Sequence, residues 1–351
     1  MSAQPLPPLP QPVHELDFTP LGALLAGAFP GAPAPVWEPM PGGASTRRYF
    51  RARLPQASVV AMFVPDGAKP EEVARGESGS RWPFLEVHEL LASRGVDVPA
   101  VHGEDTAHGW LLLEDLGDDT LAQHLAAHPD RREALYVRAV TDLSRAQRAL
   151  ADLPAGSVVA GRAFDEHLLH WEIDHFRAWA LEARGVTLSA DDRGTFDRIA
   201  WRLARAIAGW PRAFVHRDYQ SRNLMVRPSG ALSWIDFQDA LLGPRVYDLV
   251  ALLNDSYQTF DPAFVAARLD DYARASGLSD RAAIGREFDL VTVQRKLKDA
   301  GRFVFIDRVK NNPSFLKFVE PTIAKVRASL ARLGDDEDMR ALSALLSRAL
   351  P

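Results

Sequence analysis

The spacing of apolar residues divides the chain into a strand-rich first part and a helical second part. Near the start, short apolar runs bounded by turn residues predict strands at 36–40, 49–54, 59–64 and 110–113. An apolar stripe at helical spacing predicts a helix over 82–94. This helix is expected to stop at Gly95, because a glycine can take positive φ at a helix C-terminus. The first part therefore has the pattern of a small α+β lobe.

After Gly117 the apolar positions recur mainly with the period of a helix. This periodicity predicts helices over 131–150, 164–184, 190–208, 245–258, 262–275, 281–308 and 321–348. One β element interrupts them, because the apolar runs 224–227 and 232–235 are joined by the turn residues 228–230. The second part is therefore expected to be a mainly helical lobe with one embedded hairpin, and the fold class to be α+β.

The length of 351 residues fits two lobes. We assign residues 1–20 to a proline-rich disordered tail, 21–116 to the first lobe and 117–351 to the second. The hydrophobic share of 47% and the charged share of 25% are those of ordinary globular proteins, which excludes wholesale disorder, collagen and coiled coil.

Charge and cysteine content remove several classes of function. A net charge of −5 gives no support for nucleic-acid binding. The absence of cysteine excludes disulfides, thiol nucleophiles and thiolate metal sites, and it fits a cytoplasmic location. The sequence shows neither a signal peptide nor an apolar run long enough for a membrane span. We therefore expect no nucleic-acid, membrane or obligate protein partner.

The candidate chemistry lies around the predicted hairpin. Asp218 follows an apolar run, Asn223 stands at the start of the first hairpin strand, and Asp236 ends the second. Because a hairpin returns its second strand beside its first, Asn223 and Asp236 are expected to lie close together. Two hard oxygen ligands with room for phosphate oxygens suit Mg²⁺, which leaves Asp218 to accept a proton from a hydroxyl. A solvated surface hairpin is the alternative, but the ordered set favours phosphoryl transfer.

The same residues form a known pattern. His216-Arg217-Asp218 with Asn223 five residues later matches the catalytic loop of kinases, and Asp236 matches their metal-binding aspartate. The chain resembles the aminoglycoside phosphotransferase family of kinase-like enzymes from about Trp37 to its C-terminal helices. Further motifs that carry the resemblance are 111–117, 236–239 and 247–249. The resemblance implies a protein-kinase-like fold with a small β-rich N-lobe and a larger helical C-lobe.

Within that family the chain most resembles the anomeric sugar kinases of bacterial cell-wall recycling, which phosphorylate N-acetylmuramate and N-acetylglucosamine. The motifs behind this narrower resemblance are 47–51, 216–219, 235–240 and 294–298. It implies ATP as phosphoryl donor, Mg²⁺ as cofactor, and the C1 hydroxyl of an amino sugar as acceptor.

The resemblance also implies roles for individual residues. Asp218 is the expected base or hydroxyl-positioning group, and Asn223 and Asp236 are the expected Mg²⁺ ligands. His216 and Asp248 are expected to be structural, with Asp248 bracing the catalytic loop. The residues expected to meet ATP are Gly43, Ser45, Thr46, Arg47, Arg48, Met62, Glu114 and Leu116.

One position departs from the kinase pattern. The lysine expected on the third strand is replaced by Met62, so the glutamates of helix 82–94 lack their usual partner. A degraded, inactive kinase is one explanation. The other is that Arg47, Arg48 or Arg51 supplies the cation, since arginine binds phosphate well. Solvated arginines at a strand end are an equally good interpretation of those three residues.

The acceptor is expected to be a small molecule, because the segment 237–247 is too short for an activation loop. Trp171 and His175 either face the sugar or pack the helical lobe. The cations proposed for a lactyl carboxylate are Arg222, Arg295, Lys298 and Arg302. The basic charge around 294–310 argues against a polycationic acceptor. The alternatives are an aminoglycoside or amino-alcohol phosphotransferase and a catalytically silent nucleotide-binding scaffold.

Overall fold

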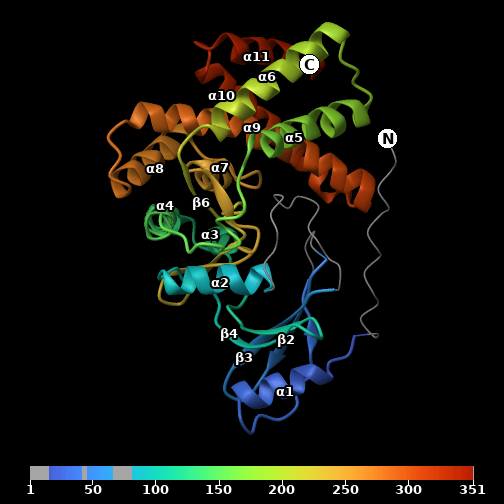
Figure 1. The fold of residues 1–351 in the computed structure, drawn as a ribbon, viewed down its shortest axis with the longest axis vertical. Helices are drawn as coiled ribbons and strands as arrows, with labels where there is room; N and C mark the ends of the chain where they lie inside the picture. The colour runs from blue at the N-terminus through green and yellow to red at the C-terminus, as the bar shows by residue number, and fades with distance from the viewer. Residues whose placement is uncertain (1–15, 42–45, 66–80, 351) are drawn as a thin grey trace. The chain divides into compact units, whose positions relative to one another are not determined.

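The computed structural model describes residues 16–41, 46–65 and 81–350 (Figure 1). The chain divides into two compact units, Met1–Val73 with Val98–Asp118 and Ala74–Asp97 with Asp119–Pro351. The expected lobe boundary after residue 116 lies close to this division, but helix α2 (Pro83–Ser93) belongs to the second unit and not to the first. The ring of Phe84 on α2 lies 5.0 Å from that of Phe237, which shows what holds the helix there.

The first unit is an antiparallel sheet of five strands in the order β1-β2-β3-β5-β4. The strands are β1 (Glu38–Pro39), β2 (Arg48–Arg53), β3 (Ser58–Phe63), β4 (Val101–Asp105) and β5 (Trp110–Glu114). Four of them agree with the predicted strands to within a few residues. The exception is β4, which was not predicted because its sequence VHGED is largely polar and its pairing with β5 is irregular.

Helix α1 (Thr19–Ala28) corrects the expected tail. Leu21 is fully buried against Phe50, Ala61 and Trp110, and the indole of Trp110 donates to the carbonyl of Asp17 at 3.0 Å. Residues 16–20 are therefore part of the folded unit, because they lead into and begin the helix that packs on the sheet. The rest of the expected tail, residues 1–15, lies outside the described residues.

The second unit is mainly helical, as predicted. Its α-helices are α2 (Pro83–Ser93), α3 (Leu121–Ala127), α4 (Arg132–Ala149), α5 (Glu166–His175), α6 (Ala190–Ala208), α7 (Tyr247–Leu253), α8 (Pro262–Ala275), α9 (Arg281–Lys310), α10 (Val319–Arg332) and α11 (Glu337–Ala349). Short helix α3 was not predicted. The single helix expected over 321–348 is two helices, because the side chain of Asp336 accepts from the amides of Asp338 and Met339 and begins a new helix. In the described part of the chain, every helix is too short or too polar to cross a bilayer.

The helix expected over 164–184 changes type along its length. After α5 it widens into a π-helix at Phe176–Leu181 and ends in a 3-10 turn at Glu182–Arg184. Beside this point α9 approaches closely, since a Cβ on Gly301 would lie 2.6 Å from the carbonyl oxygen of His175. Only glycine allows this approach. It brings the buried face of α9 against α5.

Two antiparallel strand pairs carry the site. The predicted hairpin is confirmed as β7 (Leu224–Val226) and β8 (Leu232–Trp234), with Leu224 opposite Trp234. The second pair is β6 (Arg212–Val215) with β9 (Leu241–Pro244). Strand β9 was missed because it is a short segment within a run expected to be loop. The loop 216–223 connects β6 to β7, so both of its ends are fixed by sheet pairing.

Candidate active site

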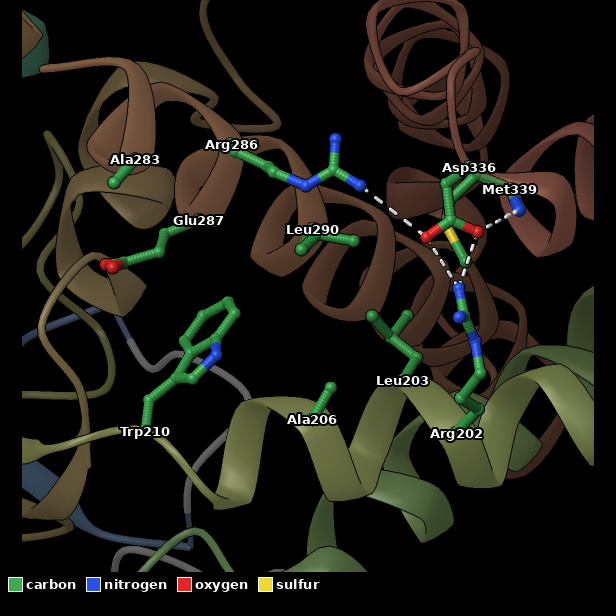
Figure 2. A pocket seen from close by; sticks show the side chains of 10 residues that line it. All are labelled: Arg202, Leu203, Ala206, Trp210, Ala283, Arg286, Glu287, Leu290, Asp336 and Met339. Carbon is green, nitrogen blue, oxygen red and sulfur yellow. Dashed lines mark hydrogen bonds and ion pairs between the residues drawn. The ribbon is translucent and has the colours of Figure 1, made fainter.

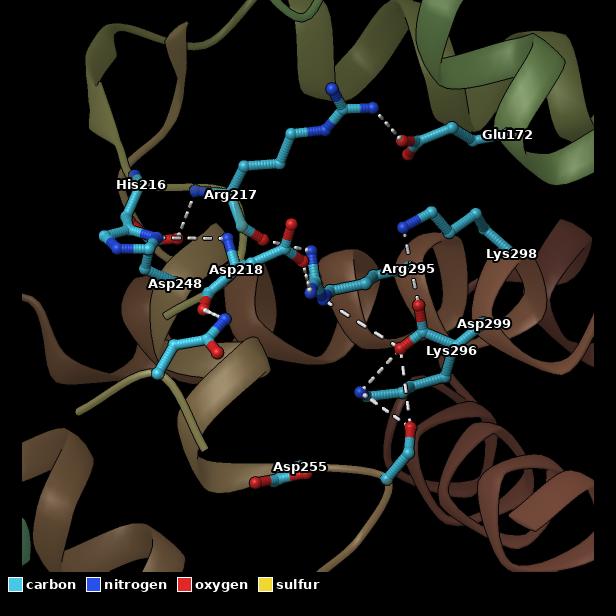
Figure 3. Close-up of polar contacts among 12 residues, drawn as sticks. Glu172, His216, Arg217, Asp218, Asp248, Asp255, Arg295, Lys296, Lys298 and Asp299 are labelled. Atoms are coloured by element: carbon cyan, nitrogen blue, oxygen red, sulfur yellow. Dashed lines mark hydrogen bonds and ion pairs between the residues drawn. The ribbon is translucent and has the colours of Figure 1, made fainter. Parts of the chain in front are cut away.

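Two side chains from later helices hold the loop 216–223 on either side of Arg217 (Figure 3). The carboxylate of Asp248 on α7 accepts from the amides of His216 at 2.7 Å and Arg217 at 3.0 Å. On the other side, Arg295 of α9 donates to the carbonyl of Arg217 at 2.8 Å. Arg217 has a φ of 79°, a left-handed conformation that costs a non-glycine residue roughly 1–2 kcal/mol. These bonds therefore fix a turn that the residue itself disfavours.

That turn sets the position of Asp218, whose side chain is half-buried with 37% of its surface exposed. Its Oδ1 lies 3.4 Å from Nη2 of Arg295. Arg295 is almost fully buried and its guanidinium lies 4.6 Å from the centre of the Tyr247 ring. Burial opposes its charge, but Tyr247, Asp299 and Asp218 keep the pKa of Arg295 well above its usual value. A permanent cation therefore holds one oxygen of Asp218.

Burial is the main cause of the shifted pKa values of His216 and Asp248, the two residues expected to be structural. It lowers the pKa of His216, despite the nearby charges of Asp218 and Asp236, so the imidazole is neutral and its Nδ1 accepts from the amide of Asp218 at 3.3 Å. It also raises the pKa of Asp248 from 3.8 to about 7, although two backbone amides favour the carboxylate. The charges of Asp218 and Asp236 both act on this imidazole in the opposite direction to burial.

Asn223 and Asp236 fit a magnesium ion. The amide nitrogen of Asn223 donates to the carbonyl of Asp218 at 2.8 Å, so its Oδ1 remains available as a ligand. The amide of Ile235 donates to the carbonyl of Asn223 at 3.0 Å, and Asp236 follows at once with a φ of 62° that turns it out of the strand. Gln238 orients the carboxylate by donating to its Oδ1 at 2.9 Å.

The number of protein ligands offered here is small, which suits Mg²⁺. Over the described residues, no group of three or more His, Asp or Glu side chains could hold a metal by itself. Mg²⁺ binds through one or two protein carboxylates or amides, with water and phosphate oxygens completing its octahedron. Asn223 and Asp236 would hold such an ion, and it would neutralise polyphosphate oxygens there.

Three cations of α9 gather around one acid that the sequence analysis did not select. Asp299 lies 2.8 Å from Lys296, 3.5 Å from Lys298 and 4.0 Å from Arg295 (Figure 3). Burial opposes ionisation, yet these cations hold the pKa of Asp299 well below its usual value. Lys298 and Arg295, both predicted to contact the acceptor, are thus buried and paired with carboxylates of this chain. A signal existed in the sequence, since an acid at a buried position of a basic helix needs such partners.

Two other buried acids also support the loop. Asp255 accepts from the amide and the hydroxyl of Ser221, at 3.2 and 2.5 Å. Glu172 on α5 is fully buried, accepts from Gln294 at 2.7 Å and lies 3.8 Å from the guanidinium of Arg217. No motif marks these two positions. Their partners come from distant parts of the chain and are visible only in the folded protein.

The predicted aromatic acceptor residues lie on α5. Trp171 is exposed, with 42% of its surface accessible, and its ring centre is 5.4 Å from that of His175. His175 is buried, and its ring also lies near Trp179 and Phe305. His175 is therefore part of the packing between α5 and α9, whereas Trp171 remains at the surface.

The first unit holds the residues predicted to bind ATP. Met62 is fully buried in β3, Glu114 ends β5, and Leu116 follows it half-buried. Arg47 and Arg48 are half-buried at the start of β2, and Thr46 is exposed. Gly43 and Ser45 lie outside the described residues.

Two further observations bear on the missing strand lysine. Arg51 is engaged by acids of its own unit, with Asp115 at 2.8 Å and Asp118 at 2.8 Å. Arg51 therefore has less charge to offer a phosphate. On α2, Glu86 accepts from the amide of Val158 and Glu89 pairs with Arg81 at 2.6 Å, so both glutamates have other partners.

A separate cavity of about 350 Å³ lies between α6, α9 and α11 (Figure 2). Leu203, Trp210, Leu290 and Met339 give it an apolar lining. At its edge Arg202 lies 2.6 Å from Asp336. None of the residues that line it comes from the loop 216–223 or the hairpin, so this cavity is distinct from the candidate active site.

Comparison with known proteins gives the family. A family model described as "Phosphotransferase enzyme family" matches residues 36–284. Two N-acetylmuramate/N-acetylglucosamine kinases are similar over most of the chain. The one from Pseudomonas putida is 34% identical over 322 residues, 86% of this chain and 89% of that protein. The one from Pseudomonas aeruginosa is 35% identical over 314 residues, 85% and 86% of the two chains.

Solved structures confirm the protein-kinase-like α+β fold. A choline kinase from Streptococcus pneumoniae matches with a TM-score of 0.58 at 16% identity, covering 88% of this chain and 98% of that one. The GDP complex of aminoglycoside 2'-phosphotransferase-IIIa matches with a TM-score of 0.59 at 14% identity, covering 87% and 97%. The family match and the sequence relatives confirm the resemblance found in the motifs: this chain is a phosphotransferase that belongs to the phosphotransferase enzyme family.

Proposed function

We propose that this protein is an ATP-dependent, Mg²⁺-dependent kinase that phosphorylates the C1 hydroxyl of N-acetylmuramate and N-acetylglucosamine. The observation that carries the proposal is the loop in which Asp218 is held by Arg295 beside Asn223 and Asp236. The relatives that cover most of the chain are kinases of these two sugars. We assign this reaction to the recycling of cell-wall amino sugars, and the lack of cysteine fits work in the cytoplasm.

Asp218 orients the attacking hydroxyl and takes its proton as the sugar oxygen bonds to the γ-phosphorus of ATP and the bond from that phosphorus to ADP breaks. Arg295 keeps one carboxylate oxygen in place, so the other oxygen can face the acceptor. Asn223 and Asp236 would hold Mg²⁺, which stabilises the charge of the transferring phosphoryl group. Because phosphoryl transfer needs little covalent chemistry from the protein, this positioning supplies most of the rate.

The nucleotide residues come from the first unit. We assign adenine to the backbone of Glu114 and Leu116, and the phosphates to the segment Gly43–Arg48, with Arg47 or Arg48 taking the part of the absent lysine. Structures of the same fold contain AMP, ADP and GDP, which supports nucleotide binding as such. The buried Met62 contributes only apolar contact in this assignment.

A second candidate is a silent nucleotide-binding scaffold, because Met62 stands where a lysine is expected. One experiment separates the two. The purified protein is incubated with ATP, Mg²⁺ and each of four acceptors: the two sugars, choline and an aminoglycoside. We expect ADP release only with the sugars, and a product whose phosphorus is coupled to the anomeric proton in NMR spectra.

Two results would contradict the proposal. Turnover of choline or the aminoglycoside alone would assign another acceptor to the same site. ATP binding without ADP release for any acceptor would favour the scaffold. Asp218→Asn serves as the matched control, because it keeps the size of the side chain and removes the proton acceptor.

A further inference from the structure

Arg222 lies in the catalytic loop, between Asp218 and the metal ligand Asn223. Its side chain is exposed, and its guanidinium carbon lies 3.6 Å from the centre of the Tyr257 ring. Stacking on an aromatic face leaves the N–H edge of a guanidinium open, and that edge binds a carboxylate in a bidentate manner. The geometry thus presents a cation on the same loop as the reacting carboxylate.

The support beneath this cation is rigid. The amide of Tyr257 donates to one oxygen of Asp255 at 2.9 Å, and the other oxygen accepts from Ser221. Asp255 therefore ties the residue before Arg222 to the ring on which Arg222 stacks. The ring centre of Phe318 lies 4.7 Å from that of Tyr257 in an edge contact, and Lys325 donates to the carbonyl of Asp255. A preorganised site loses less entropy on binding than a mobile surface arginine would.

The other cations near Asp218 are already neutralised. Arg295, Lys296 and Lys298 are buried and form ion pairs with Asp218 or Asp299. Arg222 differs from them, because among the described residues it forms no ion pair with a carboxylate and its recorded contact is with the Tyr257 ring. An incoming anion can therefore pair with Arg222 without displacing a carboxylate of the described part of the chain.

The place of Arg222 in the loop suits a substituent of the acceptor. Arg222 follows Asp218 by four residues and directly precedes Asn223, whose side-chain amide donates to the carbonyl of Asp218 at 2.8 Å. In N-acetylmuramate the lactyl carboxylate is carried on C3, two ring carbons from the C1 hydroxyl. A group that binds this carboxylate must lie near Asp218, and the loop that carries Asp218 also carries Arg222.

We propose that Arg222, held on Tyr257, binds the carboxylate of an acidic amino-sugar acceptor and so sets the preference for N-acetylmuramate over N-acetylglucosamine. This inference rests on the proposed function and adds a residue that distinguishes its two substrates. The neutral sugar lacks the carboxylate, so it gains nothing from Arg222.

The test measures kcat and KM of Arg222→Gln for both sugars at saturating ATP and Mg²⁺. We expect the KM for N-acetylmuramate to rise roughly 10–100-fold with little change in kcat, which is the signature of lost ground-state binding. The kinetics for N-acetylglucosamine are expected to stay within about twofold. Arg222→Lys is expected to be intermediate, because it keeps the charge but not the bidentate edge.

The matched control is Lys317→Gln. Lys317 is also exposed and lies 5.1 Å from an aromatic ring, that of Phe318, in the same aromatic cluster as Tyr257. Its removal is expected to leave both sugars unaffected. An equal loss for both sugars in Arg222→Gln, or no loss for either, overturns the proposal. If the unaltered protein turns over neither sugar, the proposed function itself fails, which is a different result from equal loss in the variant.

Discussion

Arg295→Met is the substitution that most sharply tests how the catalytic loop is held. Arg295 donates to the carbonyl of Arg217 at 2.8 Å and lies 3.4 Å from the carboxylate of Asp218, and only 3% of its side chain is exposed. Methionine keeps much of the length and the apolar stem but removes both polar contacts. The carbonyl of Arg217 then loses its partner, and Asp218 is free to turn away from the acceptor.

The size of the effect follows from these contacts. Hydrogen bonds to charged groups contribute about 1.5–3 kcal/mol each. If about 2–4 kcal/mol of the total acts on the transition state, kcat falls roughly 30–1000-fold, at about 1.4 kcal/mol per factor of ten. The Kd for ATP is expected to change little, because neither contact is made by a predicted nucleotide residue.

The assay compares Arg295→Met with Lys296→Met by steady-state kinetics and thermal unfolding. Lys296 is equally buried on the same helix and shares Asp299, but its contacts are with Ser256 and Asp299 and not with the loop. Both variants are expected to lower the Tm, because each removes one of the buried cations that offset the charge of Asp299. Only Arg295→Met is expected to lose most of its kcat. Equal kcat losses in the two variants would refute the positioning role.

Three further outcomes follow from the structure. The raised pKa of Asp248, about 7 against 3.8, means that the folded protein keeps a proton there that the unfolded chain releases; its contribution to stability therefore falls as pH rises from about 4 to 7. In denaturant unfolding, the free energy of unfolding of Asp248→Asn is expected to rise relative to that of the wild type by roughly 1.4 kcal/mol for each pH unit in that window. A difference between the two proteins that does not change with pH would contradict this. Gly301→Ala places a Cβ 2.6 Å from a backbone oxygen, so its free energy of unfolding is expected to fall by about 1–3 kcal/mol. Gly285→Ala is the control on the same helix: its Cβ meets nothing within 4 Å, and the substitution is expected to stabilise the protein slightly. Asp236→Asn is expected to raise the half-saturating Mg²⁺ concentration at least about tenfold in a metal titration of activity, and an unchanged titration would exclude Asp236 as a ligand.

The hairpin and its flanking residues could be predicted because their signals are local. Turn residues between two apolar runs specify β7 and β8, and the pairing of Leu224 with Trp234 then places Asn223 beside the end of the second strand. The kinase pattern of the loop added the expected roles. The long amphipathic helices were predictable for the same reason, since each carries its own period of apolar positions.

The remaining features depend on contacts between distant segments. The sequence suggested Arg295 as a substrate ligand, but in the structure it donates to the carbonyl of Arg217, 78 residues away. Asp255 carries no motif, and its bonds to Ser221 and Tyr257 are visible only in the folded protein. Helix α1 was missed for a similar reason, because the sheet residues against which it packs, Phe50 and Trp110, are distant in the sequence.

The most direct test of the account is the turnover of Asp218→Asn. The substitution is nearly isosteric, so the loop is expected to keep its fold and ATP its affinity, as shown by an unchanged Tm and Kd. The account predicts that kcat for N-acetylglucosamine, the acceptor that makes no use of Arg222, falls by a factor of about 10² to 10⁴, the usual contribution of a positioned base. A variant that binds ATP normally and retains the kcat of the wild type would contradict the assignment of Asp218 as the group that receives the acceptor proton.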